Sequence, residues 1–242
     1  MKFYHLLLLS VPALLGTSCS TEDVPTPSKG DMTSFTVIMP EGMTTRFGEG
    51  TTAKNLAVAV FDENDNLLYS SVEGEGQAMP EGASVGNFQN GLTTTVTLPL
   101  VKGKAYNIAF WAYADNSPYT FSPSEKKITV DYAEAKANDE TRDAFFKYYK
   151  LAASNMSQNN VELRRPFAQV NIGTSDIETA TVAGMTATSA NITFPAGALA
   201  SSFNFTTGTA DTPNTTEVIF TGTSIPTDNF PVQPETYKYL AM

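Results

Sequence analysis

Residues 161–174, VELRRPFAQVNIGT, divide the chain into two strand-rich parts. The stretch begins with a basic pair and Pro166, and Phe167, Val170 and Ile172 follow in a strand-like alternation that Gly173 ends. We therefore predict a strand over residues 168–172. We expect one folded unit before this stretch and a second one from it onward.

The composition allows a packed core and argues against nucleic acid as a partner. Hydrophobic residues make up 41% of the 242 residues and aromatic residues 11%, so wholesale disorder is not expected. The formal net charge is −10 at pH 7, which repels phosphate backbones and anionic lipid.

The first residues have the outline of a lipoprotein leader. Lys2 precedes an apolar run over residues 6–15, which is too short to span a bilayer, and small residues stand directly before Cys19. We predict a signal peptide over residues 1–18, lipid attachment at Cys19, and a flexible tether over residues 19–31 that is rich in Ser, Thr, Pro and acid. The alternative is an ordinary secreted protein with an incidental cysteine.

Residues 32–158 are expected to form an N-terminal unit dominated by strands. The run over residues 56–61 is almost wholly apolar, which suits a central strand covered on both faces. Phe145, Tyr148, Tyr149 and Ala152 recur at spacings of three and four, so we predict an amphipathic helix over residues 139–154 that packs on the sheet. The predicted strands cover residues 33–39, 56–61, 67–72, 92–100, 105–114 and 128–132.

Residues 159–242 are expected to form a C-terminal unit. Turn residues recur every ten to fifteen positions between short strands, a spacing typical of an antiparallel sandwich. The ending, YKYLAM, has the pattern of an opening strand, so we expect the second unit to be truncated and the sequence to be a piece of a longer protein. The predicted strands here cover residues 168–172, 190–194, 203–205 and 216–220, with the start of another over residues 237–242.

One turn resembles a calcium loop. Asp62, Asn64, Asn66 and Glu73 match oxygen positions of an EF-type loop, but Leu67 stands where that loop requires glycine. Asp and Asn are also the usual residues of hairpin turns. We therefore expect a turn and no metal or other cofactor.

The inventory of side chains argues against an enzyme. His5 and Cys19 are the only histidine and the only cysteine, and both lie in or at the end of the predicted leader. Catalytic triads, cysteine–histidine pairs and histidine-ligated metals are thereby excluded from the mature chain. A pair of carboxylates for glycoside hydrolysis is the alternative that the inventory leaves open.

Several motifs in order give the chain a family resemblance. It resembles the fimbrillins of Bacteroidetes type V pili, the Mfa-like and FimA-like fimbrial subunits. The motifs are GTSC ending at Cys19, PEGMTTRFGEG at residues 40–50, NLAVAVFDENDNLLY at 55–69, TRDAFFKY at 141–148, LRRPFAQVNIGT at 163–174 and YKYLAM at 237–242.

The resemblance implies two tandem transthyretin-like β-sandwich domains, joined at Arg164 to Pro166, on a lipoprotein carried to the outer membrane surface. It implies that an arginine-specific protease cuts after Arg46 and removes the first strand, residues 33–39. A strand of another fimbrial subunit then fills the groove, so that the subunits polymerise and support adhesion. Some anchor subunits of such pili keep their lipid and stay uncut.

A binding module that does not polymerise is the alternative. In this hypothesis the protein is a lipid-anchored receptor for glycan or protein, and Trp111, Tyr113 and Tyr119 would form an exposed aromatic platform.

Overall fold

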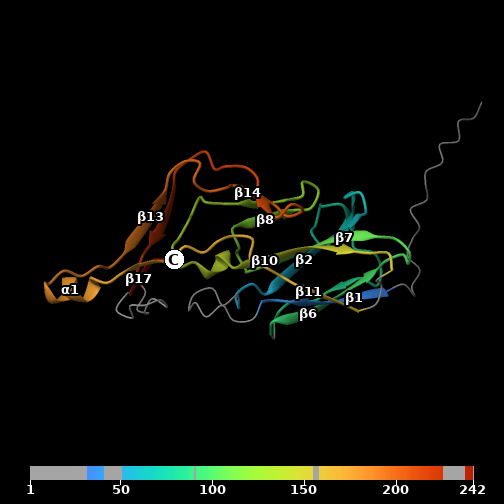
Figure 1. Cartoon of the computed structure of the whole chain (residues 1–242), viewed down its shortest axis with the longest axis horizontal. Helices are drawn as coiled ribbons and strands as arrows, with labels where there is room; N and C mark the ends of the chain where they lie inside the picture. Colours follow the sequence, from blue (N-terminus) through green and yellow to red (C-terminus); the bar gives the residue numbers. More distant parts are fainter. Residues whose placement is uncertain (1–31, 41–50, 90, 155–157, 226–237, 242) are drawn as a thin grey trace, which may run out of the picture.

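The protein is mainly β in a computed structural model that describes residues 32–40, 51–89, 91–154, 158–225 and 238–241 (Figure 1). The first sheet has the order β11-β1-β6-β5. Its strands are β1 (Met32–Ile38), β5 (Ser84–Val85), β6 (Thr93–Pro99) and β11 (Gln158–Glu162).

The second sheet contains the longest strands and has the order β10-β7-β2-β3-β4. Its strands are β2 (Asn55–Asp62), β3 (Leu67–Ser70), β4 (Gln77–Ala78), β7 (Tyr106–Tyr113) and β10 (Ala144–Leu151). The third sheet, with the order β15-β14-β9-β8, contains β8 (Tyr119–Ser122), β9 (Lys127–Val130), β14 (Ser202–Asn204) and β15 (Thr209–Ala210).

The second sheet is the middle of three layers, because a separate core packs on each of its faces. Along β2, Val58 and Val60 point into the first core, whereas Ala57 and Ala59 point into the second core. This explains the six consecutive buried residues of β2, which the sequence predicted. The aromatic side chains buried in the first core are Phe35, Phe88, Tyr106, Phe110 and Phe145, and the large side chains of the second core are Phe61, Trp111, Phe121, Ile128, Phe146, Phe203 and Phe205.

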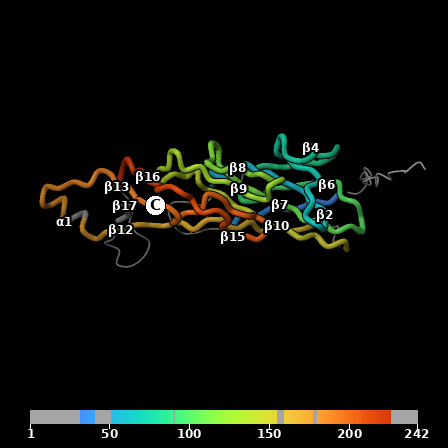
Figure 2. The backbone as a smooth tube through the Cα atoms, turned by 90° about the horizontal axis from the view of Figure 1, so that it is seen from above, coloured from blue at the N-terminus to red at the C-terminus, as the bar shows by residue number. Residues whose placement is uncertain are grey.

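The distal part of the chain extends away from these layers (Figures 1 and 2). It contains the antiparallel pair β13 (Ala190–Phe194) and β16 (Val218–Gly222), the pair β12 (Ile172–Thr174) and β17 (Lys238–Ala241), and the short helix α1 (Ile177–Val182). The segment before β10 adds to β16, since the Ala137 amide donates to the Thr221 carbonyl at 3.0 Å and the Thr221 amide donates to the Ala135 carbonyl at 3.1 Å.

The helix predicted over residues 139–154 is wrong. The segment forms a single 3-10 turn, Glu140–Arg142, and then β10, which pairs with β7 along its whole length. Phe145 and Tyr149 face the first core while Phe146 and Tyr148 face the second. A strand covered on both faces carries apolar side chains at consecutive positions, and here these also satisfy a helical spacing. The high aromatic content, which favours strands, was the signal against a helix.

The strand predicted over residues 168–172 is also wrong, since β12 begins only at Ile172. The other predicted strands are confirmed to within a few residues. Hydrogen bonding crosses the predicted unit boundary at residue 158, because β11 pairs with β1 and β14 pairs with β9. The sheets of the described residues therefore combine strands from both sides of that boundary.

Candidate functional site

The first strand, β1, lies between two strands that come much later in the chain. It pairs antiparallel with β6, from Met32 opposite Pro99 to Ile38 opposite Thr93, and parallel with β11, from Ser34 opposite Gln158. Both edges of β1 are therefore hydrogen-bonded. Without β1, the facing edges of β6 and β11 would have unpaired backbone groups and would border an open slot.

The inward face of β1 is fully buried. Phe35 and Val37 are each 0% exposed, and Thr33 and Met39 are also buried. The ring of Phe35 lies 5.8 Å from that of Phe110 and 6.0 Å from that of Tyr149. A strand that took the place of β1 would have to fill these same positions.

The two processing residues predicted from the sequence, Cys19 and Arg46, lie outside the described residues. Arg46 falls in the segment between β1 and Thr51, and Cys19 precedes β1. Because Cys19 is the only cysteine, no disulfide can join the two sides of residue 46. A cut after Arg46 would leave β1 held by hydrogen bonds and packing alone.

The aromatic residues predicted to bind glycan do not form an exposed platform. Trp111 is 2% exposed and lies in the second core. Tyr113 and Tyr119 are half-buried, and the Tyr119 hydroxyl donates to the backbone carbonyl of Arg142 at 3.0 Å. The buried indole removes the basis on which a stacking surface was expected there.

The Asp62 carboxylate accepts hydrogen bonds from backbone amides of its own turn. Asp62 accepts hydrogen bonds from the Asn64 amide at 2.8 Å and from the Asn66 amide at 2.9 Å. Burial alone would raise the pKa of Asp62, but the hydrogen bonds from Asn66 and Asn64 hold it below its ordinary value. Across the described segments, no group of three or more acidic, histidine or cysteine side chains could hold a metal ion.

The basic pair Arg164–Arg165 lies in the joint, the junction of the two predicted units at residues 164–166, and is bonded to β10. The Arg164 amide donates to the Phe146 carbonyl at 3.0 Å, and the Phe146 amide donates to the Arg164 carbonyl at 2.8 Å. Arg165 Nη1 lies 2.7 Å from Asp143 Oδ1, and its guanidinium lies 4.7 Å from the centre of the Phe145 ring. Asp143 is buried, so this ion pair is largely shielded from water.

The same carboxylate also ties down the chain that follows the predicted processing segment. The Thr52 hydroxyl lies 3.1 Å from Asp143 Oδ2 and 2.8 Å from the Glu140 carbonyl. Asp143 thus links residue 52 with Arg165.

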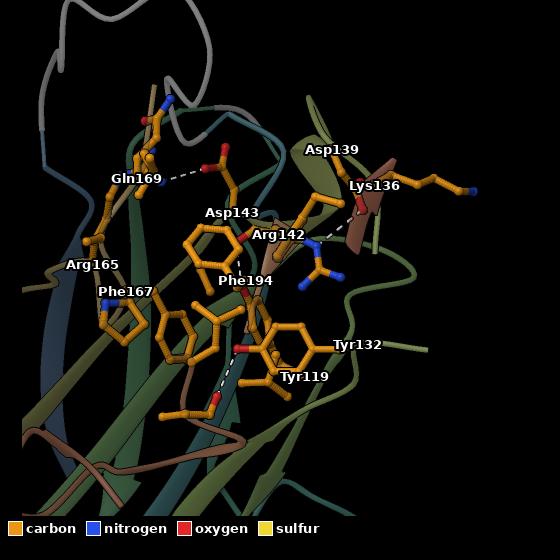
Figure 3. Close-up of a pocket in the computed structure, with 18 of the residues that line it drawn as sticks. Tyr119, Tyr132, Lys136, Asp139, Arg142, Asp143, Arg165, Phe167, Gln169 and Phe194 are labelled. Carbon is orange, nitrogen blue, oxygen red and sulfur yellow. Dashed lines mark hydrogen bonds and ion pairs between the residues drawn. The ribbon is translucent and has the colours of Figure 1, made fainter. Parts of the chain in front are cut away.

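A cavity of about 470 Å³ lies beside this joint (Figure 3). It is bordered by β8 and β9, by residues 165–170, and by the distal strands β13 and β16. Its walls are mainly apolar, and the aromatic rings that line it are Tyr119, Tyr132, Phe167, Phe194 and Phe220.

These rings form two groups. Tyr119 and Phe167 stack with their centres 5.1 Å apart and their planes inclined by 22°. Tyr132 and Phe194 both meet Phe220 edge to face, at 6.2 Å and 5.7 Å. Burial raises the pKa of Tyr119 and of Tyr132, so both hydroxyls stay neutral at ordinary pH.

The guanidinium of Arg142 forms part of the cavity wall. It lies 5.7 Å from the centre of the Tyr132 ring and 5.2 Å from that of Phe220. Sequence reasoning missed this site. Arg142 lies in the segment wrongly predicted as a helix, and Phe167 lies beside the wrongly predicted strand. Phe194 and Phe220 lie on correctly predicted strands whose pairing has no local signal. The clustering of Tyr119, Tyr132 and Phe167 near acidic and basic residues was the available signal, but spacing along the chain did not join them.

Comparison with known proteins places the chain in a family. Residues 29–242 match the model of DUF6562, a family of unknown function. The chain belongs to this family. No curated protein matches it.

Crystal structures of similar shape share few residues with this DUF6562 member. One, "putative polysaccharide binding proteins (DUF1812)" from Bacteroides thetaiotaomicron, is 9% identical with a TM-score of 0.44, over 87% of this chain and 71% of that one. A "putative adhesin" from Bacteroides ovatus is 9% identical with a TM-score of 0.42, over 81% and 63%. A fimbrial assembly protein from Parabacteroides distasonis is 15% identical with a TM-score of 0.36, over 87% and 85%.

Within the described part of this DUF6562 chain, no helix is long and apolar enough to cross a membrane.

Proposed function

We propose that this protein is a fimbrial structural subunit that assembles by strand exchange and supports adhesion. In this proposal it is exported as a lipoprotein attached through Cys19 to the outer membrane. An arginine-specific protease then cuts after Arg46, which frees the subunit from its lipid and releases β1. The partners are other fimbrial subunits, each of which supplies a strand to its neighbour.

The position of β1 is the observation that carries the proposal. It precedes every other described strand, yet it lies inside the first sheet with a neighbour on each side. Its order in the chain means that one cut in the connection to β2 detaches it without severing another strand. Its place in the sheet means that its loss leaves a slot with two hydrogen-bonding edges, which is the requirement for strand addition.

The buried face of β1 explains why such a slot would be filled by a partner. Phe35 and Val37 are both fully buried, and burying side chains of this size is worth about 1.5–3 kcal/mol each. A subunit without β1 exposes the apolar surfaces that these side chains covered, including the ring of Phe110. A strand with apolar residues at alternate positions restores both the packing and the hydrogen bonds.

The proposal is tested by treating the purified full chain with an arginine-specific protease. Mass spectrometry should detect cleavage after Arg46, and unheated denaturing gels should then show a ladder of oligomers that heating converts to monomer.

Arg46→Lys is the matched control, because it keeps the charge but is not a substrate for such a protease. It should stay uncut and monomeric. A chain that remains monomeric after complete cleavage at Arg46, with β1 still bound, would overturn strand exchange.

A further inference from the structure

The cavity beside the joint has the size and lining of a small-molecule site. Its volume of about 470 Å³ falls within the range of about 300–1,000 Å³ typical of ligand pockets. The tyrosine hydroxyls on its wall already donate to backbone carbonyls, Tyr119 to Arg142 at 3.0 Å and Tyr132 to Ala200 at 2.8 Å. What the tyrosines add to the lining is therefore mainly the apolar surface of their rings.

Two guanidinium groups line this cavity, and they differ in how their donors are used. Arg165 is paired with Asp143 through a charge-assisted hydrogen bond of 2.7 Å. Arg142 Nη2 makes a long hydrogen bond of 3.4 Å to the Asp131 carbonyl, and its side chain also interacts with the Tyr119 hydroxyl. Its Nε forms an ion pair of 3.7 Å with Asp139 Oδ2 but has no hydrogen-bond partner. A guanidinium carries five N–H donors, so most of the donors of Arg142 are unused within the protein.

Burial makes these unused donors significant. The Arg142 side chain is only 16% exposed. The guanidinium lies over the rings of Tyr132 and Phe220, and a ring face offers it a cation–π contact but no conventional hydrogen-bond acceptor. A carboxylate matches a guanidinium well, because its two oxygens accept two parallel hydrogen bonds, and on an apolar body it needs less desolvation than a phosphate.

We propose that this cavity binds a small organic acid that has an apolar, ring-sized body and one carboxylate. The carboxylate accepts hydrogen bonds from Arg142, and the body lies among the rings of Tyr119, Phe167, Tyr132, Phe194 and Phe220 (Figure 3). Lys136, Asp139 and Glu140 also line the cavity, so acidic and basic groups are balanced there. Recognition therefore depends on direct hydrogen bonds to Arg142 more than on net charge.

The sole tryptophan provides a signal for binding. Trp111 meets Tyr119 edge to face, with ring centres 5.7 Å apart, and Tyr119 lines the cavity. Phenylbutyrate is the probe, and phenylbutanol is its uncharged counterpart. Titration of the full chain with each, followed by Trp111 fluorescence and by calorimetry, should give saturable binding of the acid and at least about tenfold weaker binding of the alcohol.

Arg142→Gln should weaken phenylbutyrate binding by at least about tenfold, since it removes the charged donors. Arg164→Gln is the matched control, because Arg164 stacks on Phe146 away from the cavity lining and its loss should leave binding unchanged. If circular dichroism shows that the glutamine variant does not fold, Arg142→Lys keeps the charge and should still bind more weakly because it lacks the planar fork.

Absence of saturable binding at millimolar phenylbutyrate would overturn the proposal, as would equal affinity for the acid and the alcohol. Equal affinity of the wild type and the folded Arg142 variant would also overturn it. The inference holds whether or not the subunit polymerises, because none of the lining residues belongs to β1. Failure of this test and failure of strand exchange are therefore separate results.

Discussion

Substitution of Phe35 by alanine tests whether β1 leaves the subunit after cleavage at Arg46 or stays bound to it. The Phe35 side chain is 0% exposed and packs against the rings of Phe110 and Tyr149. Truncation of a fully buried phenylalanine costs about 3–5 kcal/mol, through lost transfer energy and the cavity that remains. The uncut Phe35→Ala protein should therefore unfold at a lower urea concentration, by a margin that corresponds to about 3–5 kcal/mol.

The effect should disappear after cleavage at Arg46. If β1 departs, the processed chains of the variant and the wild type start after residue 46 and are the same molecule. Urea unfolding followed by Trp111 fluorescence measures both forms, since Trp111 is buried in the second core. Because the weakened strand is released more easily, the cut variant should also assemble faster than the cut wild type.

Ser34→Ala is the control for a change within the same strand. Ser34 lies on the opposite face of β1 from Phe35 and is half-buried. Its replacement should shift the free energy of unfolding by less than about 1 kcal/mol. The reasoning fails if Phe35→Ala costs less than about 1 kcal/mol in the uncut protein. It also fails if the cut variant remains less stable than the cut wild type, because β1 would then still be bound.

Three further predictions concern Asp143 at the joint, the lipid attachment residue Cys19 and the buried hydroxyl of Tyr119. Asp143→Asn should speed cleavage after Arg164 by an arginine-specific protease, because backbone hydrogen bonds and the 2.7 Å ion pair of Arg165 with Asp143 hold this segment in the intact protein; equal cleavage rates would contradict this. If Cys19 carries the proposed lipid, mass spectrometry should find an acyl mass on the wild type and phase separation should place it in the detergent phase, and Cys19→Ser should abolish both; a wild type without the acyl mass would exclude lipidation. Burial raises the pKa of Tyr119, so as pH rises the unfolded chain loses the hydroxyl proton before the folded chain does. The free energy of unfolding should therefore fall as pH rises above about 10, and urea unfolding of Tyr119→Phe should show a smaller fall.

The sequence predicted most strands of the layered body because their patterns are local. The apolar run of β2 and the alternation of β1 are each visible in fewer than ten residues. The same local reasoning failed for β10, where burial on both faces placed Phe145 and Phe146 side by side and produced a helical spacing by coincidence. β2 also buries both faces, but it is an unbroken apolar run, whereas Lys147 and Lys150 interrupt the run in β10 and leave apolar positions at a helical spacing.

Long-range pairing had no local signal at all. Ile128 lies opposite Phe203, and this pairing joins β9 to β14 and completes the third layer. The cavity depends on such pairings as well, since its rings come from β8, β13, β16, Phe167 beside the joint and the segment that follows β9. Residue types identified candidates such as Tyr119, but only the fold shows that Tyr119 faces Phe167 and lies beside Arg142.

The two cores explain how a subunit could survive the loss of a strand. The buried apolar side chains of β1, Phe35 and Val37, belong to the first core, and no residue of β1 belongs to the second. The second core, with Trp111, Phe146 and Phe203, would remain complete after cleavage at Arg46. Thr52 lies beyond that cut and would keep its hydrogen bond to Asp143, which also holds Arg165. A processed subunit would thus keep its joint and one intact core while the first sheet remained open to a partner strand.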